Sequence, residues 1–457
     1  MDDTISAIAT ALGVGSIGVI RLSGPESLAI ANTLFQGRKA LGPAAARQLL
    51  YGHIKDREGQ EVDEVLAVYM PGPHSYTGED VCEIQCHGGR QALQEILALT
   101  YQAGARPAEP GEFTKRAFLN GRLDLAEAES VMDIINAKSR RALLAANRGH
   151  EGGLSKKVKA IREELRGLIA QLEAVIDYPE EDIEDVTYEK AQEVLAKGRA
   201  AVDQLLQKGS AGRILREGLR TAIVGRPNVG KSSLLNQLLQ TDRAIVSSIP
   251  GTTRDIIEEQ MTIAGIPLVL TDTAGLRDTE DYVEKIGVER SRAVLEDAQL
   301  ALVVLDGSQK LTEEDESLLE SLNGRQKLIL VNKADILPME VDLNALKRKY
   351  GDENVLVLSV KTGEGMEAVA QWLQHFVYGE GSDSELGSVT QNARQENLLR
   401  KALQSLEDAL QGAQNHYPYD CLTIDLTQAL HDLGEITGED VPDEIINEIF
   451  ARFCVGK

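Results

Sequence analysis

The chain has 457 residues, 42% of them hydrophobic and 26% charged, which is typical of a globular protein with room for about three domains. No apolar run approaches the roughly 20 residues that a membrane span needs, and the N-terminus lacks the basic start of a signal peptide, so we expect no membrane contact and a cytoplasmic location. The net charge of −24 argues against an extended basic surface that binds nucleic acid, since phosphate contacts need clustered Lys and Arg.

Residues 1–120 alternate short apolar runs and turns, with strand patterns at 17–22, 65–70 and 81–86 and a helical pattern near 90–103. This arrangement predicts an α+β domain. The glycines between Gly13 and Gly18 spell a dinucleotide-binding fingerprint, but they open onto a strand pattern and not onto a helix. We therefore assign no dinucleotide site to them.

Four cysteines, Cys82, Cys86, Cys421 and Cys454, are too few and too scattered for a disulfide framework, which agrees with a reducing compartment. Cys82, Cys86 and His87 have a spacing that suggests zinc. However, the cysteines alternate with polar residues as in a half-buried strand, and a fourth ligand is missing. We interpret them as core residues.

Residues 121–215 and 380–457 are rich in Ala, Leu, Glu and Lys with helical periodicity, broken near Asp177-Tyr178-Pro179. They flank a complete α/β pattern at 216–379, so we expect one helical domain with a second domain inserted into it. The predicted fold class is an α+β N-terminal domain, an α-helical domain and an inserted α/β P-loop domain. The first helical segment also carries a basic run that is a candidate for a local RNA contact: Lys156, Lys157, Lys159 and Arg162. The pattern by itself favours a solvated helix face, and a basic partner protein that carries most of the RNA is the alternative.

The stretch from Gly225 to Ser232 matches the phosphate-binding pattern GxxxxGK[ST], between a strand pattern at 222–224 and an apolar helical one from 234. In such a loop Lys231 supplies charge at the β and γ phosphates, and the Ser232 hydroxyl can bind Mg²⁺. The expected nucleotide contacts of this segment are Asn228, Val229, Gly230, Lys231, Ser232 and Ser233.

Three later segments indicate that the nucleotide is GTP. Asp272-Thr273-Ala274-Gly275 follows an apolar run, so that its carboxylate can hold Mg²⁺ through water while the glycine approaches the γ phosphate. In Asn332-Lys333-Ala334-Asp335 the final carboxylate can accept two hydrogen bonds from a guanine edge, whereas adenine leaves the pair unsatisfied. Ser359-Val360-Lys361 completes the base pocket through its backbone.

A polar loop before Asp272 lies where a switch loop closes over Mg²⁺ and the γ phosphate, and Thr253 is the candidate for a second hydroxyl on Mg²⁺. Leu276 stands where Ras-like enzymes carry a water-positioning Gln, so hydrolysis must be organised differently. The expected nucleotide contacts of this loop are Ser247, Ser248, Ile249, Pro250, Gly251, Thr252 and Thr253.

Several segments together resemble the MnmE (TrmE) family of bacterial tRNA-modification GTPases. Two of them lie in the α/β domain, Gly251-Thr252-Thr253-Arg254-Asp255 and Asp272-Thr273-Ala274-Gly275-Leu276-Arg277, and one closes the chain, Phe453-Cys454-Val455-Gly456-Lys457. The likeness extends to N-terminal blocks: Tyr76-Thr77-Gly78-Glu79-Asp80, His87-Gly88-Gly89, Pro110-Gly111-Glu112-Phe113 and Arg116-Ala117-Phe118-Leu119-Asn120-Gly121. It therefore covers the whole chain.

The resemblance implies a GTPase that is activated by K⁺ and whose G domains pair across their nucleotides. K⁺ near the phosphates would offset developing negative charge as an arginine does. Glu284 matches the family's catalytic glutamate, which orients the attacking water, although the residue by itself reads as a solvated helix position. The matched K⁺ positions are Asn228, Ser247, Ile249 and Thr252.

The resemblance also implies a folate site for 5,10-methylene- or 5-formyl-tetrahydrofolate. A pterin needs a carboxylate for its amino and N–H groups, a role suited to Glu83, while basic residues can hold the glutamate tail. Arg122 departs from the lysine of some members, and each position alone reads as a surface ion pair. The matched positions are Arg21, Glu83, Arg122 and Lys457.

The C-terminus is implied to lie near the folate, with Cys454 important for modification. From composition alone Cys454 reads as a buried residue, and a frayed tail is the general expectation for a chain end. Cys454-Val455-Gly456-Lys457 has the spacing of a prenylation box, but Gly456 is not aliphatic and Lys457 is not a usual last residue.

The resemblance implies a homodimer that acts with an FAD-dependent partner (MnmG, also called GidA), forming a heterotetramer that adds a carboxymethylaminomethyl group to C5 of the wobble uridine of tRNA. Residues 1–120 would then form a folate-binding and dimerisation domain. Two alternatives stay open. One is an Era-type ribosome-assembly switch, which should carry a basic RNA-binding module that we do not find; the other is a one-carbon-transfer enzyme that GTP only regulates.

Overall fold

A computed structural model describes residues 3–11, 13–178, 187–241, 259–270, 298–379 and 391–457. The chain forms two compact units. The first comprises residues 1–132, 150–199 and 401–457, and the second comprises residues 133–149 and 200–400. None of the helices in the described ranges combines the length and the apolar character that a membrane span requires.

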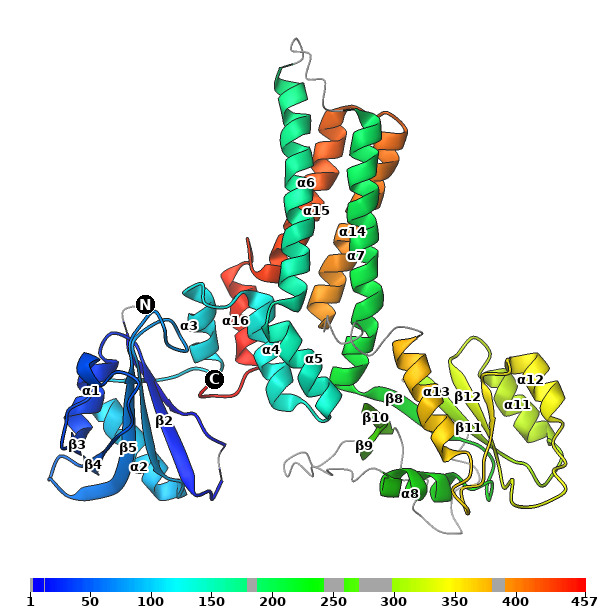
Figure 1. Cartoon of the computed structure of the whole chain (residues 1–457), viewed down its shortest axis with the longest axis horizontal. Helices are drawn as coiled ribbons and strands as arrows, with labels where there is room; N and C mark the ends of the chain where they lie inside the picture. The colour runs from blue at the N-terminus through cyan, green and yellow to red at the C-terminus, as the bar shows by residue number, and fades with distance from the viewer. Residues whose placement is uncertain (1–2, 12, 179–186, 242–258, 271–297, 380–390) are drawn as a thin grey trace. The chain divides into compact units, whose positions relative to one another are not determined.

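The first unit contains a seven-stranded sheet in the order β3-β4-β5-β6-β2-β1-β7, antiparallel except for β1 and β7 (Figure 1). Helices α1 (Ser27–Leu34) and α2 (Arg90–Gln102) pack on one face and bury the alternate residues Cys82, Ile84 and Cys86. Glu83 consequently lies on the other face. The strands are β1 (Ile5–Ile8), β2 (Ile17–Ser23), β3 (Phe35–Gly37), β4 (Leu50–Lys55), β5 (Glu61–Met70), β6 (Val81–His87) and β7 (Arg106–Pro107), with a 3-10 turn at Pro43–Ala45.

Helices make up the rest of this unit, and some of them continue into the second unit, which also contains nearly all of the helix over Arg140–His150. In α6 the buried residues recur at alternating steps of four and three, as in Leu154, Val158, Ile161 and Leu165, and they form a stripe that packs against α15. Helix α6 ends at Asp177, where the sequence predicts an interruption. The helices are α3 (Glu112–Leu119), α4 (Leu125–Asn136), α5 (Arg140–His150), α6 (Gly153–Asp177), α7 (Tyr188–Glu217), α14 (Ala393–Gln414), α15 (Tyr419–Thr437) and α16 (Asp443–Ala451).

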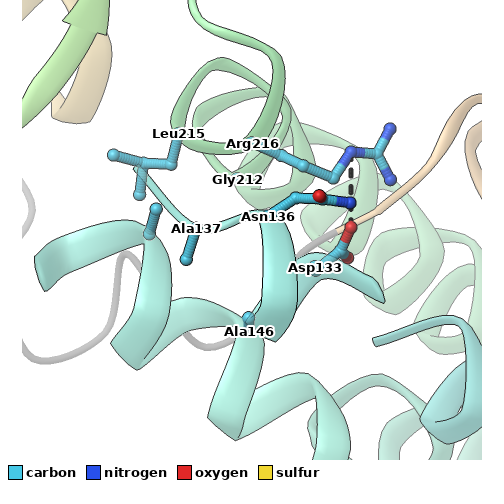
Figure 2. Close-up of a pocket in the computed structure, with 8 residues that line it drawn as sticks. Asp133, Asn136, Ala137, Ala146, Gly212, Leu215 and Arg216 are labelled. Atoms are coloured by element: carbon cyan, nitrogen blue, oxygen red, sulfur yellow. Dashed lines mark ion pairs between the residues drawn. The ribbon is translucent and has the colours of Figure 1, made fainter. Parts of the chain in front are cut away.

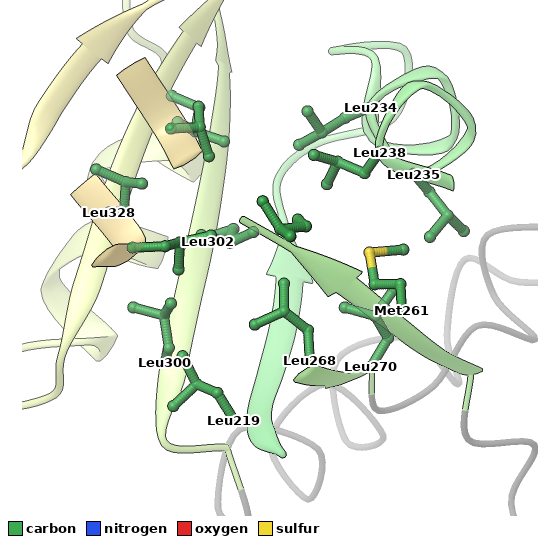
Figure 3. Close-up of a cluster of buried hydrophobic side chains, with 14 of the residues drawn as sticks. Leu219, Leu234, Leu235, Leu238, Met261, Leu268, Leu270, Leu300, Leu302 and Leu328 are labelled. Carbon is green, nitrogen blue, oxygen red and sulfur yellow. The ribbon is translucent and has the colours of Figure 1, made fainter. Parts of the chain in front are cut away.

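The second unit is built on a six-stranded sheet in the order β13-β12-β11-β8-β10-β9, parallel except for β9. Both faces are covered. Leu300, Leu302 and Val304 of β11 pack towards α8 and α13, while the intervening residues pack towards α11 and α12. Figure 3 shows Leu300 and Leu302 in one cluster with Leu234, Leu235 and Leu238 of α8. The strands are β8 (Leu219–Val224), β9 (Glu259–Ile263), β10 (Ile266–Leu270), β11 (Leu300–Asp306), β12 (Lys327–Asn332) and β13 (Val355–Val357). The helices are α8 (Lys231–Thr241), α11 (Glu313–Ser321), α12 (Leu343–Tyr350) and α13 (Met366–Tyr378).

The predicted fold class is therefore confirmed: an α+β N-terminal part, a helical part and an α/β part of the P-loop type. In the parallel sheet the carboxyl ends of β8, β11, β12 and β13 meet at one edge, and ligands of such sheets bind at this edge. The predicted phosphate loop and base-binding segments all follow these strands.

Candidate functional site

The phosphate loop joins β8 directly to α8, and its shape depends on residues with a positive φ. Gly225 has φ +152°, and an added Cβ would lie 2.4 Å from the carbonyl oxygen of Val304. At Gly230 the φ is +107°, and a Cβ would lie 2.3 Å from Nδ2 of Asn332. Asn228 adopts φ 64°, which is uncommon outside glycine. The loop therefore packs too closely on β11 and β12 for side chains at its glycines.

Lys231 lies folded over this loop. Its Nζ donates to the carbonyl oxygens of Gly225 at 2.6 Å and Arg226 at 2.7 Å. Burial lowers the pKa of Lys231 from its ordinary value of 10.5. An ammonium group in this position can exchange carbonyl oxygens for phosphate oxygens, which relieves the cost of burying the charge.

The base end of the site is held together by Asn332 and Ser359. Asn332 Nδ2 donates to the carbonyl oxygen of Val229 at 2.8 Å, and its Oδ1 accepts from the backbone N–H of Val360 at 3.0 Å. Ser359 Oγ donates to Asp335 Oδ1 at 2.7 Å, which lowers the pKa of that carboxyl. A single buried amide thus joins the phosphate loop to the base-binding segments, and Asp335 is oriented as an ionised acceptor.

Two carboxylates that the sequence analysis did not select also contact these segments. Asp306, at the end of β11, pairs with Lys333 at 2.6 Å. Asp315, in the first turn of α11, pairs with Arg226 of the phosphate loop at 2.8 Å. The strand-end position of Asp306 and the capping box Thr312-x-x-Asp315 are signals from which both residues could have been selected.

Ser232 and Ser233 lie exposed in the first turn of α8, and the Lys361 side chain is also exposed. The remaining predicted residues of this site lie outside the described residues: Ser247, Ser248, Ile249, Pro250, Gly251, Thr252, Thr253, Asp272, Thr273, Ala274, Gly275 and Glu284.

The predicted folate residues Arg21, Glu83 and Arg122 come together around one aromatic ring in the first unit. Arg21 Nε donates to Glu83 Oε1 at 2.8 Å across the β2–β6 pair. The guanidinium carbons of Arg21 and Arg122 lie 5.0 and 5.1 Å from the centroid of the Tyr76 ring, and that of Arg21 lies 5.7 Å from the Phe113 ring. Both rings belong to sequence blocks that carry the family resemblance, but only the structure shows that they lie against these guanidinium groups.

The C-terminal residues are fixed beside α3. Val455 forms a β-bridge with Pro110, and the carbonyl oxygen of Lys457 accepts from the N–H of Phe113 at 3.1 Å. At Gly456 the φ is +91°, and a Cβ would lie 2.2 Å from the carbonyl oxygen of Ile8. Cys454 is exposed, contrary to the expectation from composition that it is buried. The tail is thus ordered by tertiary contacts, while its thiol faces solvent.

A buried ion network supports α3. Arg116 is fully buried and pairs with Asp3 at 2.8 Å, Glu79 at 3.1 Å and Glu112 at 3.0 Å, and Glu112 also pairs with Arg106 at 2.6 Å. Burial raises the pKa of Glu112, but hydrogen bonds from Arg106 and Arg116 outweigh it, so the pKa lies below the ordinary value of 4.5. The network anchors α3, which contains Phe113 and contacts the C-terminal tail.

The cysteine pair of β6 and the basic run of α6 lie in the first unit. Cys82 and Cys86 are buried in the core beneath α1 and α2, and burial raises the pKa of the Cys82 thiol to about 12 and that of Cys86 to about 11. The core interpretation of these cysteines therefore stands.

In the basic run, Lys159 pairs with Asp124 at 3.0 Å and Arg162 pairs with Glu439, which reduces the positive charge available to RNA.

A small cavity lies in the second unit between the ends of α4, α5 and α7 (Figure 2). Its rim carries an ion pair between Asp133 and Arg216 at 3.8 Å. The other lining residues are Asn136, Ala137, Ala142, Ala146, Gly212 and Leu215. The cavity shares no residue with the phosphate loop or the base-binding segments, and we assign no function to it.

Family models match two stretches of the chain. Residues 4–122 match a family model described as GTP-binding protein TrmE N-terminus, and residues 125–454 match one described as MnmE helical domain. A tRNA modification GTPase MnmE from Listeria welshimeri is 47% identical over 456 residues, covering 100% of this chain and 99% of the relative. Its counterpart from Alkaliphilus metalliredigens is 46% identical over 460 residues, covering 100% of both chains.

Among solved structures, the G domain of the T. maritima FeoB iron transporter matches with 27% identity and a TM-score of 0.26, covering 35% of this chain and 98% of that one. Identity of 46–47% along the whole chain, together with both family models, establishes the family. The chain belongs to the MnmE family of tRNA modification GTPases.

Proposed function

We propose that this chain hydrolyses GTP to drive the modification of tRNA in the cytoplasm. The observation that carries the proposal is the assembly of Lys231, Asn332 and Asp335 at one edge of a parallel sheet. Lys231 lies where it can meet the β and γ phosphates, Asn332 joins the loop to the base pocket, and Asp335 presents a carboxylate that matches guanine. The domains would be residues 1–120, residues 121–215 with 380–457, and residues 216–379.

The residues present fit the two cations that such a site needs. Ser232 lies exposed at the start of α8, where its hydroxyl would bind Mg²⁺ together with Thr253, and Asp272 would act through water. Asn228 is exposed on the phosphate loop and carries a side-chain amide oxygen of the kind that a hard cation such as K⁺ takes as a ligand, with Ser247, Ile249 and Thr252 completing the set. When bound, the K⁺ supplies positive charge beside the phosphates.

Hydrolysis would depend on Glu284, which we assign to orienting the attacking water because Leu276 replaces the usual glutamine. Pairing of two G domains across their nucleotides would complete the site. A Glu284→Ala variant should bind GTP normally but fail to hydrolyse it; loss of binding would instead indicate a structural role.

The first unit suits a tetrahydrofolate. Two guanidinium groups lie against the Tyr76 ring and offer positive charge for an anionic tail, and Glu83 offers a carboxylate for pterin N–H groups. Lys457 would add a further charge. When bound, the folate supplies the one-carbon unit, while this chain orients it and keeps the exposed Cys454 thiol at the docked terminus nearby.

We further propose that a homodimer works with an FAD-dependent partner to add a carboxymethylaminomethyl group at C5 of the wobble uridine, with GTP turnover supplying conformational change. The test is mass spectrometry of tRNA nucleosides from cells lacking this chain, complemented by wild type or by Cys454→Ser. Loss of 5-aminomethyl-type wobble uridines that only wild type restores would support the proposal.

Two outcomes would favour the alternatives. Unchanged nucleosides with disturbed ribosome assembly would favour an Era-type switch. Full modification with a nonhydrolysable GTP analogue would mean that GTP only regulates a one-carbon transfer.

A further inference from the structure

The β11–α11 loop, taken here as residues 306–315 from the last residue of β11 to the first turn of α11, carries two carboxylates that each pair with a cationic side chain of the candidate nucleotide site. Asp306 is 6% exposed and Asp315 is 1% exposed. We infer that this loop is a clamp that positions both halves of the nucleotide site, with Asp306 orienting Lys333 at the base and Asp315 orienting Arg226 at the phosphates. The inference rests on the proposed assignment of these segments to GTP.

At the base half, Asp306 uses its two oxygens for different partners. Oδ2 binds Nζ of Lys333 at 2.6 Å, while Oδ1 accepts from the backbone N–H and the hydroxyl of Ser308 at 3.0 and 2.6 Å. Lys333 itself holds φ 68°, a conformation that L residues seldom adopt. The carboxylate is therefore fixed by its own loop, and it restrains a long side chain that would otherwise lose conformational entropy on binding the base.

At the phosphate half, Asp315 is also divided between two partners. Oδ1 accepts from Nε of Arg226 at 2.8 Å, and Oδ2 accepts from the backbone N–H and hydroxyl of Thr312 at 3.0 and 2.9 Å. The carbonyl oxygen of Arg226 in turn accepts from Nζ of Lys231 at 2.7 Å. A buried carboxylate thus fixes the backbone segment on which the phosphate-binding lysine rests.

Backbone contacts make the loop a single unit with the site. The N–H of Gly307 donates to the carbonyl oxygen of Asn332 at 2.8 Å, and a Cβ at Gly307 would lie 2.8 Å from that same oxygen. The two aspartates are close together in sequence, whereas Arg226 and Lys333 lie at the ends of different strands. A shift of this loop would therefore disturb both halves at once, and neither aspartate needs to touch the nucleotide.

The test is equilibrium binding of fluorescent mant-GDP to the full chain, with GDP and GMP as competitors. Asp306→Asn should weaken the binding of GDP and of GMP by a similar factor of about ten, because Lys333 contacts the base that both nucleotides share. Asp315→Asn should weaken GDP binding about tenfold but leave GMP binding unchanged. Asp315 acts through Arg226 on Lys231, which contacts the outer phosphates that GMP lacks. Kinetic constants at saturating GTP should change less than the affinities.

Matched controls come from the same loop. Ser308→Ala and Thr312→Ala remove a hydroxyl from each carboxylate but leave both ion pairs, so GDP affinity should stay within about twofold of wild type. If Asp315→Asn does not fold, Arg226→Gln should reproduce its loss for GDP, and Arg226→Lys should restore part of it.

Wild-type affinity for GDP in folded Asp306→Asn and Asp315→Asn would overturn the inference, as would equal losses in the two alanine controls. Failure of the wild-type chain to bind GDP would instead overturn the proposed function on which the inference rests.

Discussion

Asp335 keeps one carboxylate oxygen bonded to Ser359 Oγ at 2.7 Å, and this bond leaves the group ionised and directed as an acceptor. We expect Asp335→Asn to weaken GDP binding at least about tenfold, because an N–H donor of guanine then faces the amide NH₂ instead of a carboxylate oxygen. The amide can instead donate to the C2 carbonyl of xanthine, so XDP should bind better than it does to wild type. Competition against mant-GDP measures both changes, and unchanged preference would remove Asp335 from the base pocket.

Of the four residues proposed to bind K⁺, Asn228 is the one that lies within the described part of the chain. Its left-handed backbone and exposed amide place an oxygen donor on the phosphate loop. GTP turnover should be at least about tenfold faster in KCl than in NaCl at equal ionic strength, since a cation near the phosphates replaces an arginine. Asn228→Ala should abolish this difference. Equal turnover of the wild type in both salts would refute the K⁺ site.

At the scale of elements, the C-terminal tail depends on Gly456. An alanine there combines the strain of a positive φ, about 1 kcal/mol, with a contact on Ile8 that the backbone must relieve. We expect Gly456→Ala to release the tail and to speed hydrogen exchange of the Phe113 amide, which donates to Lys457. Gly59→Ala is a matched control, since its φ is +84° but no atom lies within 4 Å of the added Cβ. Unchanged exchange in Gly456→Ala would show that the tail tolerates a side chain.

Helix α3 depends on the buried network around Arg116. Glu112 has a lowered pKa, so its contribution to stability is present above the unfolded value near 4.5 and is lost as the pH falls through the lower folded value. Glu112→Gln should reduce the free energy of unfolding by about 2 kcal/mol at pH 7, because Arg116 and Arg106 lose a charged partner. Urea unfolding at pH 7 and at steps below 4.5 should show the two proteins converging. A constant difference would mean that Glu112 does not titrate in this range.

For the whole molecule, the net charge of −24 and the intrachain pairing of Lys159 and Arg162 oppose RNA binding. We therefore expect the chain alone to bind tRNA weakly, with a slope of log K against log salt shallower than about −3. Fluorescence anisotropy between 50 and 200 mM salt, which is the range where phosphate contacts dominate, measures this slope. A slope near −10 would show a broad basic surface and favour the ribosome-assembly alternative.

Much of the architecture was predictable from local patterns. The strands at 17–22 and 81–86 and the helix near 90–103 lie within one residue of their observed bounds, and the second unit has the parallel sheet that its motifs require. The phosphate loop and base-binding segments were predictable for the same reason, because their chemistry needs fixed residue types at fixed spacing beside a strand.

What only the tertiary structure decided are the contacts between residues far apart in the chain. The strand-end position of Asp306 and the capping box at Asp315 are visible in the sequence, but their pairing with Lys333 and Arg226 arises only in the fold. Likewise the contacts of Arg21 and Arg122 with the Tyr76 ring depend on strands and helices that meet only in the fold. The same is true of the exposure of Cys454 on an ordered tail. Sequence periodicity reports which face of an element is buried, and motifs report local chemistry. Neither specifies which distant partner satisfies a buried charge, because that choice is made by packing.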